Sequence, residues 1–166
     1  MKLNRLHIRL AACGLASALL AACGGSSNDA PAISNPTGPI TLTGVVAKGA
    51  ALADAAITAK CATGTGAAVS IGSGFYTITI DAGALPCVLE ATSSDGLLVL
   101  HSVATGSGAS ATANITPLTE LLVAQLSGQD PAAYMAGLNA GNTSTLSTTV
   151  TAGTLGTAQT AVITML

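Results

Sequence analysis

The stretch Phe75-Tyr76-Thr77-Ile78-Thr79-Ile80 carries the clearest structural pattern in the chain. Its large side chains at Tyr76, Ile78 and Ile80 alternate with two threonines. Successive side chains of a β-strand point to opposite faces, so this alternation predicts a strand with one face on a core. β-Branched and aromatic residues also favour the extended backbone.

Comparable short runs, separated by Gly, Asp, Ser and Pro, lie on both sides of this stretch. With it, the expected strands cover residues 40–48, 55–61, 67–71, 75–80, 87–92, 97–104 and 111–115. The residues expected to face inward from the other runs include Ile40, Leu42, Val46, Ile57, Ala59, Cys61, Cys87, Leu89 and Ala91. Period-2 runs bounded by turn residues predict a mainly β fold, an all-β sandwich over residues 40–116.

Two segments carry a family resemblance. Gly44-Val-Val-Ala-Lys-Gly-Ala-Ala-Leu-Ala-Asp-Ala-Ala-Ile-Thr58 resembles the opening of carboxypeptidase-regulatory-like domains, with Ala51 where Pro is usual and Asp54 where Gly is usual. Gly74-Phe-Tyr-Thr-Ile78 is similar to that family's Gly-x-Tyr-x-Ile strand. The resemblance implies a seven-stranded antiparallel, transthyretin-like β-sandwich, an accessory fold without catalytic machinery. An immunoglobulin-type sandwich is the alternative.

Cys61 and Cys87 both fall on expected inward faces. They are the thiols that remain if the chain is exported and Cys23 is lipidated, and an exported protein meets an oxidising environment. We therefore expect a Cys61–Cys87 disulfide, with two buried free thiols as the alternative. Two cysteines without neighbouring ligands do not indicate a metal site.

Residues 117–166 change to helix signals. Thr116 can cap a helix that begins at Pro117, with Glu120 near the positive end of its dipole and Gly128 as its end. Asp130-Pro131 repeats this start, and residues 139–149 are expected to be loop. Apolar residues at a spacing of three to four predict a last helix from 151. The chain ends at Leu166 within this pattern, so we expect a truncated helical segment.

The first 23 residues predict where the protein is located in the cell. Lys2, Arg5 and Arg9 precede the uncharged stretch 11–22, the layout of a secretory signal peptide. Leu20-Ala21-Ala22-Cys23 resembles a bacterial lipobox. The resemblance implies cleavage after residue 22, a diacylglycerol on the Cys23 thiol and an acylated, for example palmitoylated, new amino terminus. The alternatives are an ordinary cleaved signal peptide and a retained transmembrane helix.

Residues 24–39 contain three prolines and three glycines and predict a flexible linker after the lipidated Cys23. Gly24 stands where lipoproteins kept at the inner membrane tend to have Asp. The lipoprotein resemblance therefore implies the outer membrane in a two-membrane host. Multiple acyl chains on one residue would give a stable anchor, because one chain alone binds only marginally.

The composition excludes several functions. Charged residues make up 7% of the chain against about 25% in an average domain, and aromatic residues make up 2%. Five Lys and Arg do not provide a nucleic-acid footprint, and three of them leave with the signal peptide. So few aromatic rings offer little surface for stacking on sugars or bases.

No catalytic motif is evident. His101 and Ser102 could be combined on paper with Asp54, Asp81 or Asp95, but nothing in their spacing supports a triad. We expect His101 to be a partly buried or rim residue on the strand face shared by Val99 and Val103. Glu90 is expected on a solvated strand face. No metal-binding or cofactor-binding spacing is recognised, so none is predicted.

Together these patterns predict a non-catalytic cell-envelope lipoprotein with the domains 1–22 (signal peptide), 23–39 (lipidated Cys23 and linker), 40–116 (sandwich) and 117–166 (helical segment). Its partners would be the membrane, through the lipid, and an unidentified envelope protein or glycan. The alternatives are a carbohydrate- or peptide-binding accessory module and, with less support, a hydrolase.

Overall fold

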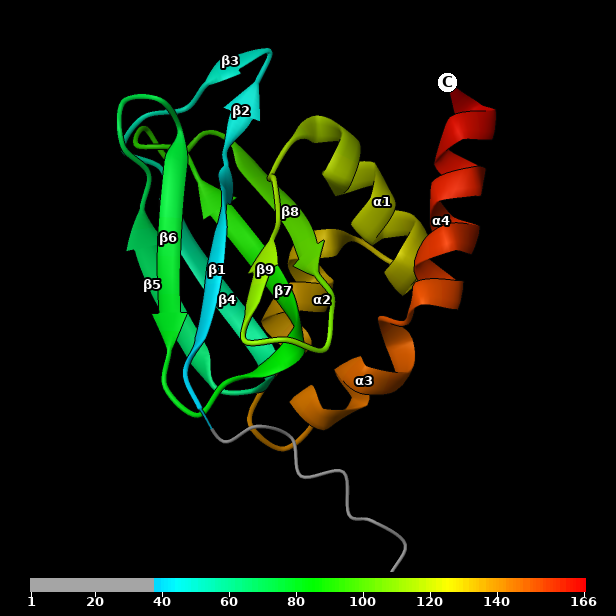
Figure 1. The fold of residues 1–166 in the computed structure, drawn as a ribbon. Helices are drawn as coiled ribbons and strands as arrows, with labels where there is room; N and C mark the ends of the chain where they lie inside the picture. The colour runs from blue at the N-terminus through cyan, green and yellow to red at the C-terminus, as the bar shows by residue number, and fades with distance from the viewer. Residues whose placement is uncertain (1–37) are drawn as a thin grey trace, which may run out of the picture. The chain divides into compact units, whose positions relative to one another are not determined.

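Two larger β-sheets, a two-stranded ribbon and a C-terminal helical part make up the chain over residues 38–166, the residues that the computed structural model describes (Figure 1). The predicted signal peptide, Cys23 and residues 24–37 of the predicted linker lie outside these residues. A three-stranded sheet has the order β6 (Phe75–Ile80), β1 (Ile40–Val45), β9 (Ser110–Thr112). A four-stranded sheet has the order β5 (Thr65–Val69), β4 (Ala56–Thr63), β7 (Ala84–Thr92), β8 (Val99–Ala104). The predicted mainly β class with a helical C-terminal part is confirmed.

The alternating pattern of the sequence decides which strand faces are buried. Ile78 of β6 lies opposite Leu42 of β1, and Ile57 of β4 lies opposite Ala91 of β7. All four are buried, and they belong to one apolar cluster that draws on both sheets. This core cluster comprises Ile40, Leu42, Val46, Ala55, Ile57, Ala59, Cys61, Tyr76, Ile78, Ile80, Cys87, Leu89, Ala91, Leu100, Ala104, Ala113 and Ile115.

Tyr76 is the largest residue of the core cluster, and its hydroxyl has a buried partner. The phenol donates to the main-chain carbonyl of Ala113. Burial raises the pKa of Tyr76 well above its usual range. A Cβ at Gly44 would lie 2.0 Å from the same Ala113 oxygen, so only glycine lets β1 pass this point.

Three strand predictions need correction. The pairing of β1 with β9 is parallel, so the sheets are not wholly antiparallel. The run 40–48 divides, because β2 (Ala47–Lys48) turns at Gly49, where φ is +74°, and pairs with β3 (Ala50–Ala51) in a separate ribbon. The run 97–104 forms a strand only from Val99, and the Leu97 side chain is 88% exposed.

Five helical segments follow the strands. They are α1 (Pro117–Ser127), α2 (Pro131–Gly137), the 3-10 helix η1 (Thr143–Thr145), α3 (Leu146–Thr149) and α4 (Ala152–Met165). The predicted caps are confirmed, since the side chains of Thr116 and Asp130 accept main-chain N–H groups. Thr151, which was not predicted as a cap, accepts the N–H of Thr154 at the start of α4. The prediction of loop throughout 139–149 is wrong, because η1 and α3 lie there.

A second, smaller apolar cluster attaches the helices to the four-stranded sheet. Its buried members are Val88, Met135, Leu138, Leu146 and Val150. Val88 comes from β7, while the other four come from the helical part. Helix α1 packs on β8 and α4 packs on α1 (Figure 1). Residues 40–116 and 117–166 therefore belong to one compact unit.

Candidate functional site

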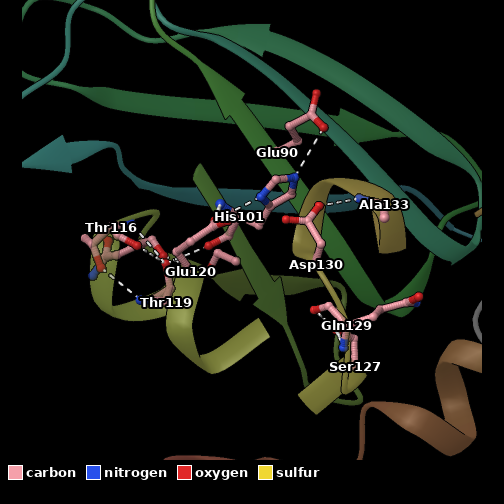
Figure 2. Close-up of polar contacts among 11 residues, drawn as sticks. Glu90, His101, Thr116, Thr119, Glu120, Ser127, Gln129, Asp130 and Ala133 are labelled. Atoms are coloured by element: carbon pink, nitrogen blue, oxygen red, sulfur yellow. Dashed lines mark hydrogen bonds and ion pairs between the residues drawn. The ribbon is translucent and has the colours of Figure 1, made fainter. Parts of the chain in front are cut away.

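The histidine of β8 lies between two glutamates (Figure 2). His101 Nδ1 is 2.9 Å from Glu120 Oε2, and His101 Nε2 is 3.3 Å from Glu90 Oε2. The imidazole is 1% exposed, whereas the Glu90 and Glu120 side chains are 30% and 27% exposed. Only the carboxylates of this group therefore have substantial access to solvent.

The strand register places Glu90 beside His101. Glu90 of β7 is the antiparallel partner of His101 of β8. Their side chains share the sheet face that also carries Val88 and Val103, which pack against the helices. The face opposite, with Leu100 and Ala104, belongs to the core cluster.

The N-terminus of α1 places Glu120. Thr116 and Thr119 form a capping box, in which Thr116 Oγ1 accepts from the Thr119 N–H and Thr119 Oγ1 accepts from the Thr116 N–H. Thr119 Oγ1 also donates to the carbonyl of His101 at 2.8 Å, and the N–H of His101 donates to Glu120 Oε2. Because β8 is an edge strand, these contacts cover main-chain groups that the sheet leaves unpaired.

Lys60 ties the helical part to the same sheet at a second point. Its ammonium donates to the carbonyl oxygens of Met135 and Leu138, each at 2.8 Å. These carbonyls lie at the end of α2, where the helix dipole favours a cation. A cavity of about 520 Å³ adjoins Lys60 and is lined by Lys60, Ala62, Thr63, Gly64, Thr65, Leu138, Asn139, Ala140 and Thr143.

The environments predicted for the His101 and Glu90 side chains need correction. His101 does share its strand face with Val99 and Val103, but it is fully buried and contacts Glu120 of α1, so it is not a rim residue. Glu90 is half-buried and contacts His101. Sequence reasoning missed Glu120 as the third member. The available signal was a histidine in an otherwise apolar run, followed by a helix with one acidic residue in its first turn.

The structure does not bring His101, Ser102 and Asp95 together as a catalytic triad. Ser102 Oγ donates to the carbonyl of Asn114 at 2.7 Å, away from the imidazole. The Asp95 carboxylate accepts from the Ser93 hydroxyl and the Leu97 N–H within its own turn. The Ser93 hydroxyl is the main reason why the pKa of Asp95 is lowered.

The two cysteines within residues 38–166 lie directly opposite each other. Cys61 of β4 pairs with Cys87 of β7, and their sulfur atoms are 2.00 Å apart, a disulfide distance. Both residues are buried in the core cluster. Within residues 38–166, no group of three or more His, Cys, Asp or Glu side chains is arranged to hold a metal ion.

An apolar groove lies between α1 and α4. Its volume is about 310 Å³, and its lining consists of Leu118, Thr119, Leu122, Gln159, Val162 and Ile163. None of the helices described over residues 38–166 has the length and apolar character needed to span a bilayer.

No family model matches the chain, and no curated protein and no solved structure matches it either. The likenesses to a lipobox and to carboxypeptidase-regulatory-like domains therefore stay predictions from the residues.

Proposed function

We propose that the chain is a non-catalytic lipoprotein of the bacterial cell envelope, in which the folded part serves as a structural or interaction module. One observation carries the anchor: Leu20-Ala21-Ala22-Cys23 ends an apolar stretch that follows three basic residues. Cleavage before Cys23 leaves two lysines against seven acidic residues, a net charge of about −5. Gly24 favours the outer membrane in a two-membrane host.

The geometry at His101 supports the absence of catalysis. A general base needs a ring nitrogen free to take a proton from a substrate. Both nitrogens of His101 face carboxylates, and the ring is buried. Ser102 donates to a main-chain carbonyl, so it has no activating partner there. The hydrolase alternative consequently receives less support than the interaction module.

The carbohydrate-binding alternative also receives less support. Sugar rings commonly stack on aromatic side chains, and the cavity beside Lys60 and the α1–α4 groove are both lined without any. A protein partner in the cell envelope fits this surface best, because it carries few charged residues and exposes large apolar side chains such as Ile71, Leu118 and Ile163.

We further propose that the two sheets close into a seven-stranded β-sandwich. Side chains from both sheets share the core cluster. Along one side, β5 leads directly into β6 of the other sheet, and a Cβ at Gly66 of β5 would lie 2.5 Å from Ile78 of β6. Along the other side, Ser102 of β8 donates to Asn114, which follows β9.

Metabolic labelling with palmitate in a two-membrane bacterial host tests the anchor. The full chain and the variant Cys13→Ala, which changes the one cysteine within the predicted signal peptide, should incorporate label. Cys23→Ala should incorporate none, because the acceptor thiol is missing. Label in Cys23→Ala, or no label in the unchanged chain, would overturn the proposal.

A further inference from the structure

The His101 imidazole contacts two hydrogen-bond acceptors, whereas a neutral ring has one N–H donor. A neutral imidazole carries one N–H, whereas an ionised carboxylate only accepts hydrogen bonds. Nδ1 lies 2.9 Å from one glutamate oxygen and Nε2 lies 3.3 Å from another. Both contacts are hydrogen bonds only when both nitrogens carry a proton, so the geometry corresponds to the imidazolium form.

The contact with Glu120 also fixes the start of α1. The same Oε2 atom accepts from Nδ1 and from the main-chain N–H of His101. The adjacent Thr119 hydroxyl donates to the His101 carbonyl. The first turn of α1 is thus bound to one residue of β8 through both its main chain and its ring, and only the ring contact changes with protonation.

The other ionisable groups on this side of the four-stranded sheet have partners of their own. Lys60 of β4 binds the carbonyls at the end of α2, and Asp130 accepts from the Ala133 N–H at its start. Tyr134 of α2 packs in the second apolar cluster, and burial raises its pKa. Glu90 from β7 and Glu120 from α1 are therefore the charged groups that contact the ring.

We propose that Glu90, His101 and Glu120 form a pH-sensitive clasp that holds α1 on the edge of β8 while His101 is protonated. Loss of the ring proton leaves one nitrogen lone pair facing a carboxylate, so a hydrogen bond to a charged group becomes a repulsion. The clasp then loosens α1, and with it α4, which packs on α1. Protonation of the two glutamates in acid removes the opposing charge and weakens the clasp from the other side.

The direction of the pH dependence follows because the protonated form of His101 is the one that binds both glutamates. The clasp is present while both ring nitrogens carry a proton, and it is lost when one of these protons leaves. Because α1 covers an edge strand, its release would expose the main chain of β8 and the Thr116–Glu120 turn. This inference does not depend on the proposed lipid anchor.

Hydrogen exchange of the full chain, corrected for intrinsic rates, tests the clasp between about pH 5 and about pH 8, where histidines change charge. Protection of the amides of Leu121–Gln125 should fall by about tenfold or more with rising pH, since a charge-assisted hydrogen bond is lost. Protection of the β6 amides should change little. Equal pH dependence in α1 and β6 would overturn the proposal.

Two variants separate the clasp from general instability. His101→Gln keeps hydrogen-bonding capacity without a titrating ring, so the pH dependence of α1 protection should disappear. If this variant does not fold, Glu90→Gln changes a half-exposed partner and should reduce the same dependence. Nitrogen chemical shifts of the His101 ring, assigned against His7 through these variants, should show both nitrogens protonated at about pH 6. A neutral tautomer there would contradict the clasp.

Discussion

The β part and the helical part of this chain are held by different forces. The core cluster between the sheets is apolar, continuous and drawn from every strand of the three- and four-stranded sheets except β5 and β9. The helical part contributes four buried apolar residues, which pack with Val88 of the four-stranded sheet, and it relies in addition on polar contacts at His101 and Lys60. Apolar burial varies little with pH, whereas ion pairs depend on it directly. The two parts should therefore respond differently to the same perturbation.

The largest expected effect is a cavity in the core cluster. Ile78→Ala removes a buried side chain between the sheets and should lower the free energy of unfolding by about 4 kcal/mol. Thr79→Ala, on the exposed face of the same strand, should cost about 1 kcal/mol or less. Urea unfolding measures both. A loss for Ile78→Ala no larger than that of its neighbour would contradict the assigned core.

The next effect concerns the cysteine pair. Cys61 and Cys87 are 26 residues apart, and the chain-entropy model gives a disulfide closing that loop about 3.5 kcal/mol, in a model-dependent way. The double variant Cys61→Ala, Cys87→Ala should lose about this amount. Adding reductant to the unchanged chain should produce a similar loss in urea unfolding. Alkylation at Cys61 and Cys87 in the unreduced, unfolded protein would refute the disulfide.

A smaller effect is expected in the second apolar cluster. Leu146→Ala should cost about 2 kcal/mol, at the low end for a buried leucine, because its short helix can move into the space left. Limited proteolysis should then increase within residues 131–166 and leave the strands uncut. The exposed neighbour Ser147→Ala is the matched control. Cleavage that begins in the strands would contradict the prediction that the helical part is less stable than the β part.

The sequence predicted the elements that depend on local pattern. Alternation assigned the inward faces of β1, β4, β6 and β7, and the capping residues Thr116 and Asp130 marked the starts of α1 and α2. Both signals lie within a few residues of the element that they specify. Hydrophobic periodicity and capping are local effects, so one sequence is enough to find them.

The parts that were missed depend on contacts between distant segments. Glu120 reaches His101 only because α1 folds back over the edge of β8, and no spacing within either segment encodes that return. The parallel pairing of β9 with β1 joins residues about 70 positions apart. Helix α3 lies in a polar stretch, where only Leu146 and Val150 contribute buried apolar side chains.

Native-state hydrogen exchange in low urea tests most directly the claim that the helices form a less stable layer on a stable β part. Amides of β4 and β7 should exchange only through global unfolding, with its full free energy and urea dependence. Amides of α4 should exchange through a smaller opening, with a lower free energy and a weaker urea dependence. If the α4 amides match those of β7 in both quantities, the two parts unfold as one and the account is wrong.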